Sequence, residues 1–190
     1  MEQKRALRRA ITGRRSVRIE RVGDGLPAVS GFPLALGRQL ALVHAVPEFD
    51  PDGYQALPIA MIARVESDEY ERFVERVLRD ERRLTEIWPA RGSPARSDLP
   101  LADWRELFQA FGTTGEFVIV ECEGRNGDDD FYLGPVVAVA GDAVAVHHVD
   151  GTAVWDQEPS VIPFDAITRV RFGERYTDVF ARHAGDPPMN

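Results

Sequence analysis

The sequence predicts an α+β protein made of two tandem five-stranded antiparallel small barrels with flanking helices. Three observations support this fold class. Short β-prone runs separated by turn residues recur in both halves of the chain, the second half repeats the order of the first, and amphipathic helical patterns flank each set of strands. A length of 190 residues suits one large domain or two small ones.

The second half shows the strand pattern most clearly. The Gly141-Asp142 pair separates two β-prone runs, which is typical of a two-residue hairpin turn. Pro163 and Phe164-Asp165 separate the last two runs. The five expected strands are 117–123, 131–140, 143–149, a segment within 153–162, and 167–172. Five short strands joined by tight turns curl most economically into a small barrel, which also protects their edges.

The first half repeats this order at a nearly constant spacing. Val17-Arg18-Ile19 matches the strand at 118–120 at a shift of 101 residues. The run 43–46 matches 146–149 at a shift of 103, and 62–65 matches 167–170 at a shift of 105. The shift grows in small steps, as expected when loops between fixed strands gain residues. The sequence therefore predicts an internal duplication.

Helical patterns lie on both sides of the strands. A stripe at three- and four-residue spacing predicts a helix that buries one face, with its first turn at Pro100: Leu101, Trp104, Leu107, Phe108 and Phe111. The segment 2–12 is its counterpart in the first half. Asp68 and Glu71 are spaced as a capping box for a helix that extends to about Trp88, and 176–180 forms a short final helix. A Pro-, Ser- and Gly-rich run gives the predicted domains: 1–88, a linker at 89–99, and 100–190.

Two segments carry a resemblance to a known group of proteins. The run IPFDAITRVRF (162–172), followed by Tyr176, and the run DDFYLGPVVAV (129–139) resemble bacterial uncharacterised proteins with paired Sm-like, or SH3-like, small β-barrels. The resemblance implies the barrel fold and no assigned activity. RNA-binding Sm proteins have an Arg-Gly pair at the entrance to the last strand, where this chain has 57–59 (LPI) and 162–164 (IPF). The resemblance therefore extends to the barrel and not to a uridine pocket.

Composition narrows the class of protein. Hydrophobic residues make up 44% of the chain and charged residues 28%, which is typical of globular proteins and excludes disorder as the main state. No apolar run approaches the roughly 20 residues of a membrane helix, and the N-terminus has no apolar core of a secretory signal. With Cys122 as the single cysteine, a cytoplasmic location without membrane attachment is expected.

Three groups of residues contain side chains that are candidates for metal binding, acid–base or nucleophilic chemistry. His147 and His148, near Asp150, are adjacent on an expected strand, so their side chains point to opposite faces and do not readily chelate one ion. The acidic run 128–130 has no calcium-loop pattern. Cys122 lies between two glutamates, which disfavour a thiolate. We therefore expect no catalytic residue, no metal ligand and no cofactor.

Charge and aromatic residues point to an interaction protein. The net charge is −8, although residues 1–21 carry eight basic and two acidic side chains. We expect a non-enzymatic adaptor or immunity-type protein with a basic protein partner, contacted through Tyr54, Trp155, Asp156 and Glu158. The opposing interpretation is that Tyr54 and Trp155 cap the barrel core. The alternative function is an RNA- or nucleic-acid-binding module that uses Arg8, Arg9, Arg14 and Arg15. A small hydrolase or metal enzyme is the third hypothesis.

Overall fold

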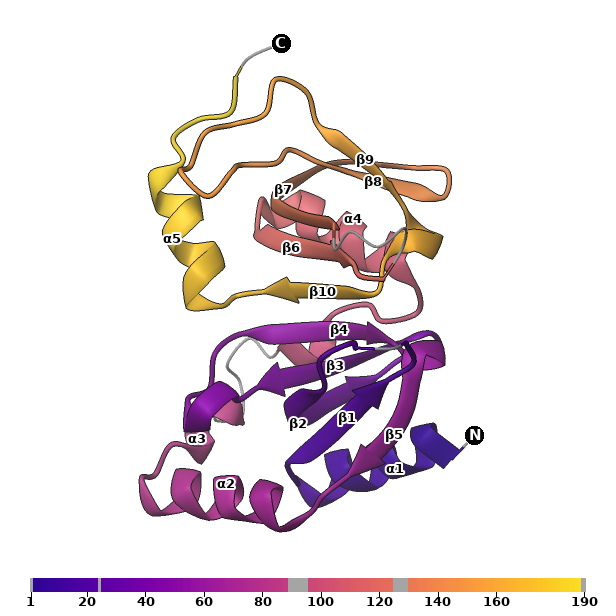
Figure 1. Ribbon diagram of the computed structural model, residues 1–190, viewed down its shortest axis with the longest axis vertical. Coiled ribbons are helices and arrows are strands. Elements are labelled where there is room, and N and C mark those ends of the chain that lie inside the picture. The colour runs from indigo at the N-terminus through magenta and orange to yellow at the C-terminus, as the bar shows by residue number, and fades with distance from the viewer. Residues whose placement is uncertain (1, 24, 89–95, 125–129, 189–190) are drawn as a thin grey trace.

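The computed structural model describes residues 2–23, 25–88, 96–124 and 130–188. The protein is α+β, with helices on the outside of an antiparallel sheet (Figure 1). The helices are α1 (Glu2–Gly13), α2 (Glu69–Asp80), α3 (Leu84–Ile87), α4 (Trp104–Thr114) and α5 (Arg175–His183). The strands are β1 (Val17–Arg21), β2 (Val29–Leu36), β3 (Leu40–Ala45), β4 (Tyr54–Pro58), β5 (Ile62–Glu66), β6 (Phe117–Cys122), β7 (Asp130–Ala140), β8 (Ala143–Val146), β9 (Ser160–Pro163) and β10 (Arg169–Phe172). Short 3₁₀ turns are η1 (Pro47–Phe49), η2 (Ile59–Met61), η3 (Arg96–Asp98) and η4 (Phe164–Ala166).

All ten described strands belong to one sheet, in the order β5-β1-β2-β3-β4-β10-β6-β7-β8-β9. The sheet does not close, so strand pairing does not confirm two separate closed barrels. The reason lies at β4, which pairs with β10 of the second half instead of with β5. The edge that would have closed the first half is thereby used to join the two halves.

The two halves share their strand order and their register. Val17 lies opposite Gly31 in the β1–β2 pair, and Val118 lies opposite Gly134 in the β6–β7 pair. The β2–β3 pair has an irregularity between Pro33 and Ala35, and the β7–β8 pair has one between Val136 and Ala138, 103 residues later. Leu40 opposite Pro58 and Ala143 opposite Pro163 complete the correspondence in the outer strands. The predicted shifts of 101, 103 and 105 residues thus describe equivalent positions in the sheet.

Each of the four longer helices covers its own apolar cluster. Helix α1 packs on β1, β2 and β5 through Leu7 and Ala10, and α2 packs through Val74 and Leu78 on Phe32. The largest core lies under α4 and includes residues of both halves: Leu40, Leu42 and Ala56 from the first, and Val118, Val170 and Phe172 from the second. This shared core fixes the two halves against each other.

Two predicted helices differ from the observed ones. Asp68 caps α2 as expected, since its carboxylate accepts hydrogen bonds from the backbone N–H groups of Tyr70 and Glu71. The helix expected to reach Trp88 instead breaks after Asp80, where Arg82 has a left-handed backbone, and a separate short α3 follows.

The helix expected from Pro100 begins at Trp104, because Asp103 caps it and the backbone of Leu101 pairs with Leu40. Of the predicted linker 89–99, residues 89–95 lie outside the described residues, and Arg96–Asp98 forms η3.

Candidate functional site

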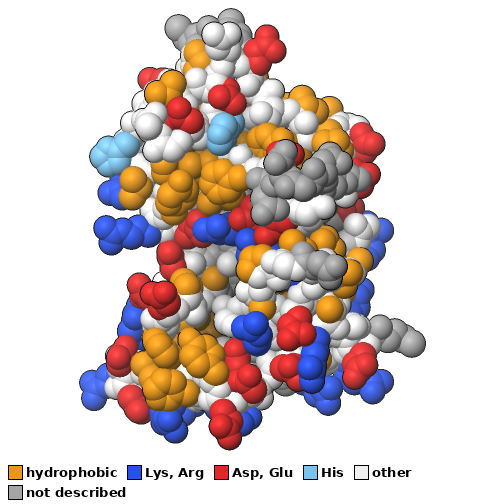
Figure 2. All heavy atoms as spheres, in the orientation of Figure 1, with side chains coloured by type: hydrophobic (Ala, Val, Ile, Leu, Met, Phe, Trp, Pro, Cys, Tyr) orange, Lys and Arg blue, Asp and Glu red, His pale blue; other side chains and the backbone are white. Residues whose placement is uncertain are grey.

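A polar cleft of about 520 Å³ lies between the two halves; we refer to it as the central cleft. The space-filling view shows it as a hollow at mid-height, with charged side chains inside and apolar side chains above and below (Figure 2). The first half contributes residues of β1, β2, η1 and β4, and the second contributes β10 and the residue before α5. Its charged lining residues are Arg18, Glu48, Asp52, Arg169, Arg171 and Glu174.

Beside and beneath the cleft, six charged side chains alternate in sign. We call this row the charge ladder: Arg21, Glu123, Arg169, Glu121, Arg171 and Glu174. Arg21 of β1 binds both carboxylate oxygens of Glu123, which follows β6, so the ladder bridges the two halves. Arg171 donates to Glu174 at 2.6 Å at the other end. Buried charges are tolerated only when paired in this way, so the ladder holds the walls of the cleft in place.

The ladder sets the ionisation of its two end carboxyl groups in opposite directions. Desolvation opposes ionisation of Glu123, but the hydrogen bond from Arg21 and the charges of Arg169 and Arg21 together hold its pKa below the ordinary value. At Glu174, burial dominates over the attraction of Arg171, and the pKa is raised. The pKa of Arg171 is raised because Glu174 and Glu121 outweigh its desolvation. The positive charges of Arg169 and Arg171, which line the cleft from β10, are therefore balanced by ion pairs with glutamates of the same chain.

Below the cleft, three side chains form what we call the first aromatic cluster: Phe49, Tyr70 and Phe73. The rings of Tyr70 and Phe73 pack on Phe49 at centroid distances of 5.8 and 5.5 Å. Glu48 and Phe49 both have left-handed backbones, which non-glycine residues adopt at a cost, and this conformation places Phe49 beside α2. Tyr70 remains 48% exposed, and it also lines the central cleft.

Above the cleft, the second aromatic cluster consists of Tyr176 and Phe180 on α5. Their ring centroids are 4.9 Å apart, and Tyr176 is 45% exposed. Phe180 packs partly onto the apolar cluster around Ile119 and Leu133. Tyr70 and Tyr176 are the second residues of α2 and α5, the helices that follow the last strand of each half. Because Glu174 immediately precedes α5 and lines the cleft, both helices begin at the same cleft.

The structure separates the partner-contact residues expected from the sequence. Tyr54 is half-buried in β4 between the rings of His44 and Phe172, where burial raises the pKa of its hydroxyl, and the guanidinium of Arg96 lies over its ring. Trp155 packs against Phe117 and donates its indole N–H to the backbone oxygen of Ala184.

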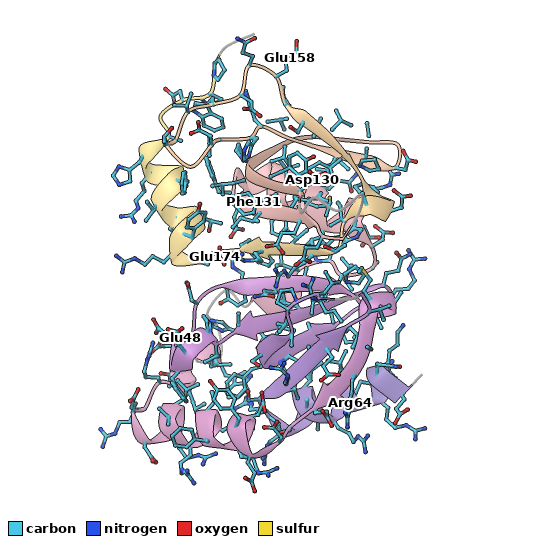
Figure 3. All side chains as sticks on the ribbon, in the orientation of Figure 1. Glu48, Arg64, Asp130, Phe131, Glu158 and Glu174 are labelled. Carbon is cyan, nitrogen blue, oxygen red and sulfur yellow. The ribbon has the colours of Figure 1, made fainter. Side chains whose placement is uncertain are left out.

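Tyr54 and Trp155 lie at different places relative to their strands, since Tyr54 is the first residue of β4 and Trp155 precedes Ser160, the first residue of β9, by five positions. Both rings pack as caps on apolar clusters. Asp156 and Glu158 are exposed in the loop before β9, and Figure 3 labels Glu158 there.

The arginines of the alternative function fall into two pairs. Arg8 and Arg9 are exposed on α1. Arg14 lies over the ring of Trp88, and Arg15 donates to the buried carboxylate of Glu75 at 2.9 Å. The second pair thus secures the end of α1 against α2 and α3.

The candidate residues for metal or acid–base chemistry have structural partners. His147 shares a hydrogen bond with the backbone oxygen of Asp156, and His148 accepts one from the N–H of Leu133. Asp150 caps the following turn through Thr152 and Val154. Cys122 is buried in the largest core.

Asp128 and Asp129 lie outside the described residues. Among the residues that the structure describes, no group of three or more His, Cys, Asp or Glu is placed to hold a metal ion. In the same residues, no helix combines the length and apolar character needed to cross a membrane.

Comparison with protein-family models, curated proteins and solved structures finds no match to this chain. The site is therefore defined by geometry alone. The sequence pattern places Tyr70, Phe73, Tyr176 and Phe180 on helices but does not single them out as contact residues. One signal could have identified the exposed pair: Tyr70 and Tyr176 stand at the same position after equivalent strands, just behind the start of each helix.

Proposed function

We propose that the chain is a non-enzymatic cytoplasmic protein-interaction protein, built as a tandem of two duplicated Sm-like units that share a single sheet. The shared strand order, the matching irregularities in β2 and β7, and the equivalent prolines that end β4 and β9 support the duplication. In each unit the helix that follows the last strand, α2 or α5, then contributes one wall of a common binding surface.

The observation that carries this proposal is the pair of aromatic clusters on either side of the central cleft (Figure 2). Tyrosine and phenylalanine are enriched at protein interfaces, where a few rings supply most of the binding energy and a polar rim surrounds them. Tyr70 and Tyr176 are exposed and each is supported by a neighbouring ring, so little side-chain entropy is lost when a partner covers them.

Charge favours a basic partner. The chain carries a net charge of −8, and Glu48 lies exposed at the rim of the cleft. The cleft arginines of β10 are already paired with Glu121, Glu123 and Glu174, so they present little free positive charge. A partner segment with apolar side chains between lysines or arginines fits this surface, because it meets rings above and below and carboxylates at the rim.

A nucleic-acid-binding function is the second candidate, supported by the exposure of Arg8 and Arg9 on α1. Binding through these two side chains would weaken with salt and would be lost in an R8A/R9A variant. It would leave Tyr70 and Tyr176 without a role, which makes the two functions separable.

The test is affinity purification of the tagged chain from its native cells, with and without nuclease. We expect the same protein partner in both preparations of the wild type, and its loss from a Tyr70→Ala/Tyr176→Ala variant. The matched control is Val137→Ala/Val154→Ala, which also truncates two exposed side chains, at a distance from the cleft. A partner protein that still co-purifies with the Tyr70→Ala/Tyr176→Ala variant contradicts the proposed surface. Loss of all partners on nuclease treatment supports the nucleic-acid alternative.

A further inference from the structure

One loop of the first half contacts both helices that carry the aromatic clusters. Residues 46–53 connect β3 to β4 and include η1; we call this segment the bridging loop. In Figure 1 the loop lies between α5 above and α2 below. Figure 3 labels Glu48 on this loop and, above it on the same side of the molecule, Glu174, which immediately precedes α5.

On the side of α2, the bridging loop is held by a ring and by an ion pair. Phe49 packs against the rings of Tyr70 and Phe73. The next residue, Asp50, binds the guanidinium of Arg83 at 2.6 Å, in the turn between α2 and α3. The loop and the first aromatic cluster therefore form one packed unit.

On the side of α5, the same loop caps the helix. Within the described residues, the side chain of Glu174 at the N-cap position makes no capping hydrogen bond. A carboxylate oxygen of Asp52 instead accepts a hydrogen bond from the N–H of Arg175 at 2.8 Å, although the two residues are 123 positions apart. Gly53 lies so close to Glu174 that an added Cβ would come within 2.8 Å of the backbone nitrogen of Glu174. Asp52 and Gly53 thus fix the first turn of α5, which carries Tyr176.

The segment between these two contacts is short and restrained. Pro47 and Pro51 restrict its backbone, because the proline ring fixes φ. The N–H of Asp50 donates to the carbonyl oxygen of Pro47 at 2.8 Å, and the N–H of Asp52 donates to that of Ala45 at 3.0 Å. The ring that packs on α2 and the carboxylate that caps α5 are therefore three residues apart on a stiff segment.

We propose that the bridging loop couples the two walls of the binding surface, and that Asp52 is a positioning residue that holds Tyr176 in a fixed relation to Tyr70. The use of this coupling rests on the proposed function, whereas the coupling itself is a property of the chain alone. A partner that covers one tyrosine finds the other already in place, which lowers the entropy lost on binding. A change at Phe49 should therefore be detected at the start of α5.

Amide hydrogen exchange of Arg175, followed by NMR in the whole chain, tests the role of Asp52. Asp52→Ala removes the acceptor and should speed exchange of this N–H about fivefold or more, the effect expected when a helix loses its N-terminal cap. Asp52→Asn keeps an acceptor oxygen at the same place and should restore most of the protection. Equal exchange rates in the wild type and in Asp52→Ala would overturn the role of Asp52.

The decisive measurement places the change and the readout on different walls. Phe49→Leu reduces the contact with α2 and should speed exchange of the Arg175 N–H about twofold or more, the lower limit for sites coupled through a backbone shift. Pro51→Ala, which loosens the loop between the ring and the cap, should act in the same direction. Arg76→Ala is the matched control, because the Arg76 side chain lies over the ring of Phe73 but belongs to α2, and it should leave this exchange rate unchanged.

Circular dichroism checks that each variant is folded, and Pro51→Ala alone carries the test if Phe49→Leu does not fold. Wild-type exchange at Arg175 in the folded loop variants, or equal acceleration by Arg76→Ala, would overturn the coupling. These readouts need no partner protein, so failure of the coupling is distinguished from failure of the proposed interaction surface.

Discussion

Replacing Glu123 by glutamine tests whether the charge ladder holds the two halves together. Glu123 binds Arg21 of the first half through both carboxylate oxygens, and the exposed fractions of the two side chains are 8% and 0%. The amide has nearly the same shape but leaves the buried guanidinium without a counter-charge. Breaking a buried ion pair by removing one partner costs about 3–5 kcal/mol. For a chain of this length, that cost corresponds to a fall of roughly 6–20 °C in the unfolding temperature.

The assay is urea unfolding at pH 7, followed by circular dichroism. Glu66→Gln is the matched control, because Glu66 pairs with Arg64 in a largely exposed ion pair whose loss should cost less than about 1 kcal/mol. An unfolding free energy for Glu123→Gln that lies within about 1 kcal/mol of the Glu66→Gln value would refute the reasoning, since Arg21 would then have found water or another partner.

Three further predictions follow from local geometry. Gly31→Ala and Gly134→Ala should each destabilise the protein by about 1–3 kcal/mol or more in urea unfolding, whereas Gly151→Ala should be nearly neutral. The reason is that an added Cβ would lie 2.1 and 1.8 Å from backbone oxygens at the first two sites and would meet open space at the third. Burial lowers the pKa of His44 to about 4, although the charges of Glu86 and Asp52 act in the opposite direction. Because the unfolded chain binds this proton at a higher pH than the folded chain, the free energy of unfolding falls as the pH drops from about 6.5 towards 4. Between pH 7 and pH 5, the free energy of unfolding measured by urea titration should fall by roughly 2 kcal/mol more for the wild type than for His44→Leu, and equal decreases would contradict this. Asp68→Ala should cost about 1 kcal/mol by removing the cap of α2, and an unchanged unfolding midpoint would contradict that role.

Local patterns identified most elements of the fold because they depend on neighbouring residues. The strand runs, the hairpin turn at Gly141-Asp142 and the capping residue Asp68 all appear in the structure. The strand that pairs with β4 could not be predicted from patterns among neighbouring residues. Whether a barrel closes on its own last strand or pairs with another unit depends on contacts between residues 114 positions apart, such as Ala56 and Val170. The end of α2 was also missed, because the helical periodicity continues through Arg82 although the backbone does not.

The candidate site was harder to predict than the fold. Tyr54 and Trp155 drew attention through their polar neighbours in the sequence, yet both rings pack on apolar clusters. Tyr70 and Phe73 fit a helical stripe, which periodicity alone assigns to the core. In the structure both rings stay exposed and pack on Phe49, which lies beside them where the backbone of Glu48 and Phe49 is left-handed. The charge ladder likewise joins β1 to β6 and β10. Its residues lie far apart in the sequence, as Arg21 and Glu123 do at a separation of 102 positions, so a local pattern could not predict their pairing.

Site-specific photo-crosslinking in the native cells tests the proposed interaction surface most directly. A photoreactive phenylalanine analogue replaces Tyr70 in one variant, Tyr176 in a second, and exposed Val137 in a third as the control. We predict that positions 70 and 176 give the same protein adduct, insensitive to nuclease, and that position 137 does not give it. Adducts to different proteins at the two tyrosine positions, or no adduct at either, would contradict a common binding surface across the central cleft.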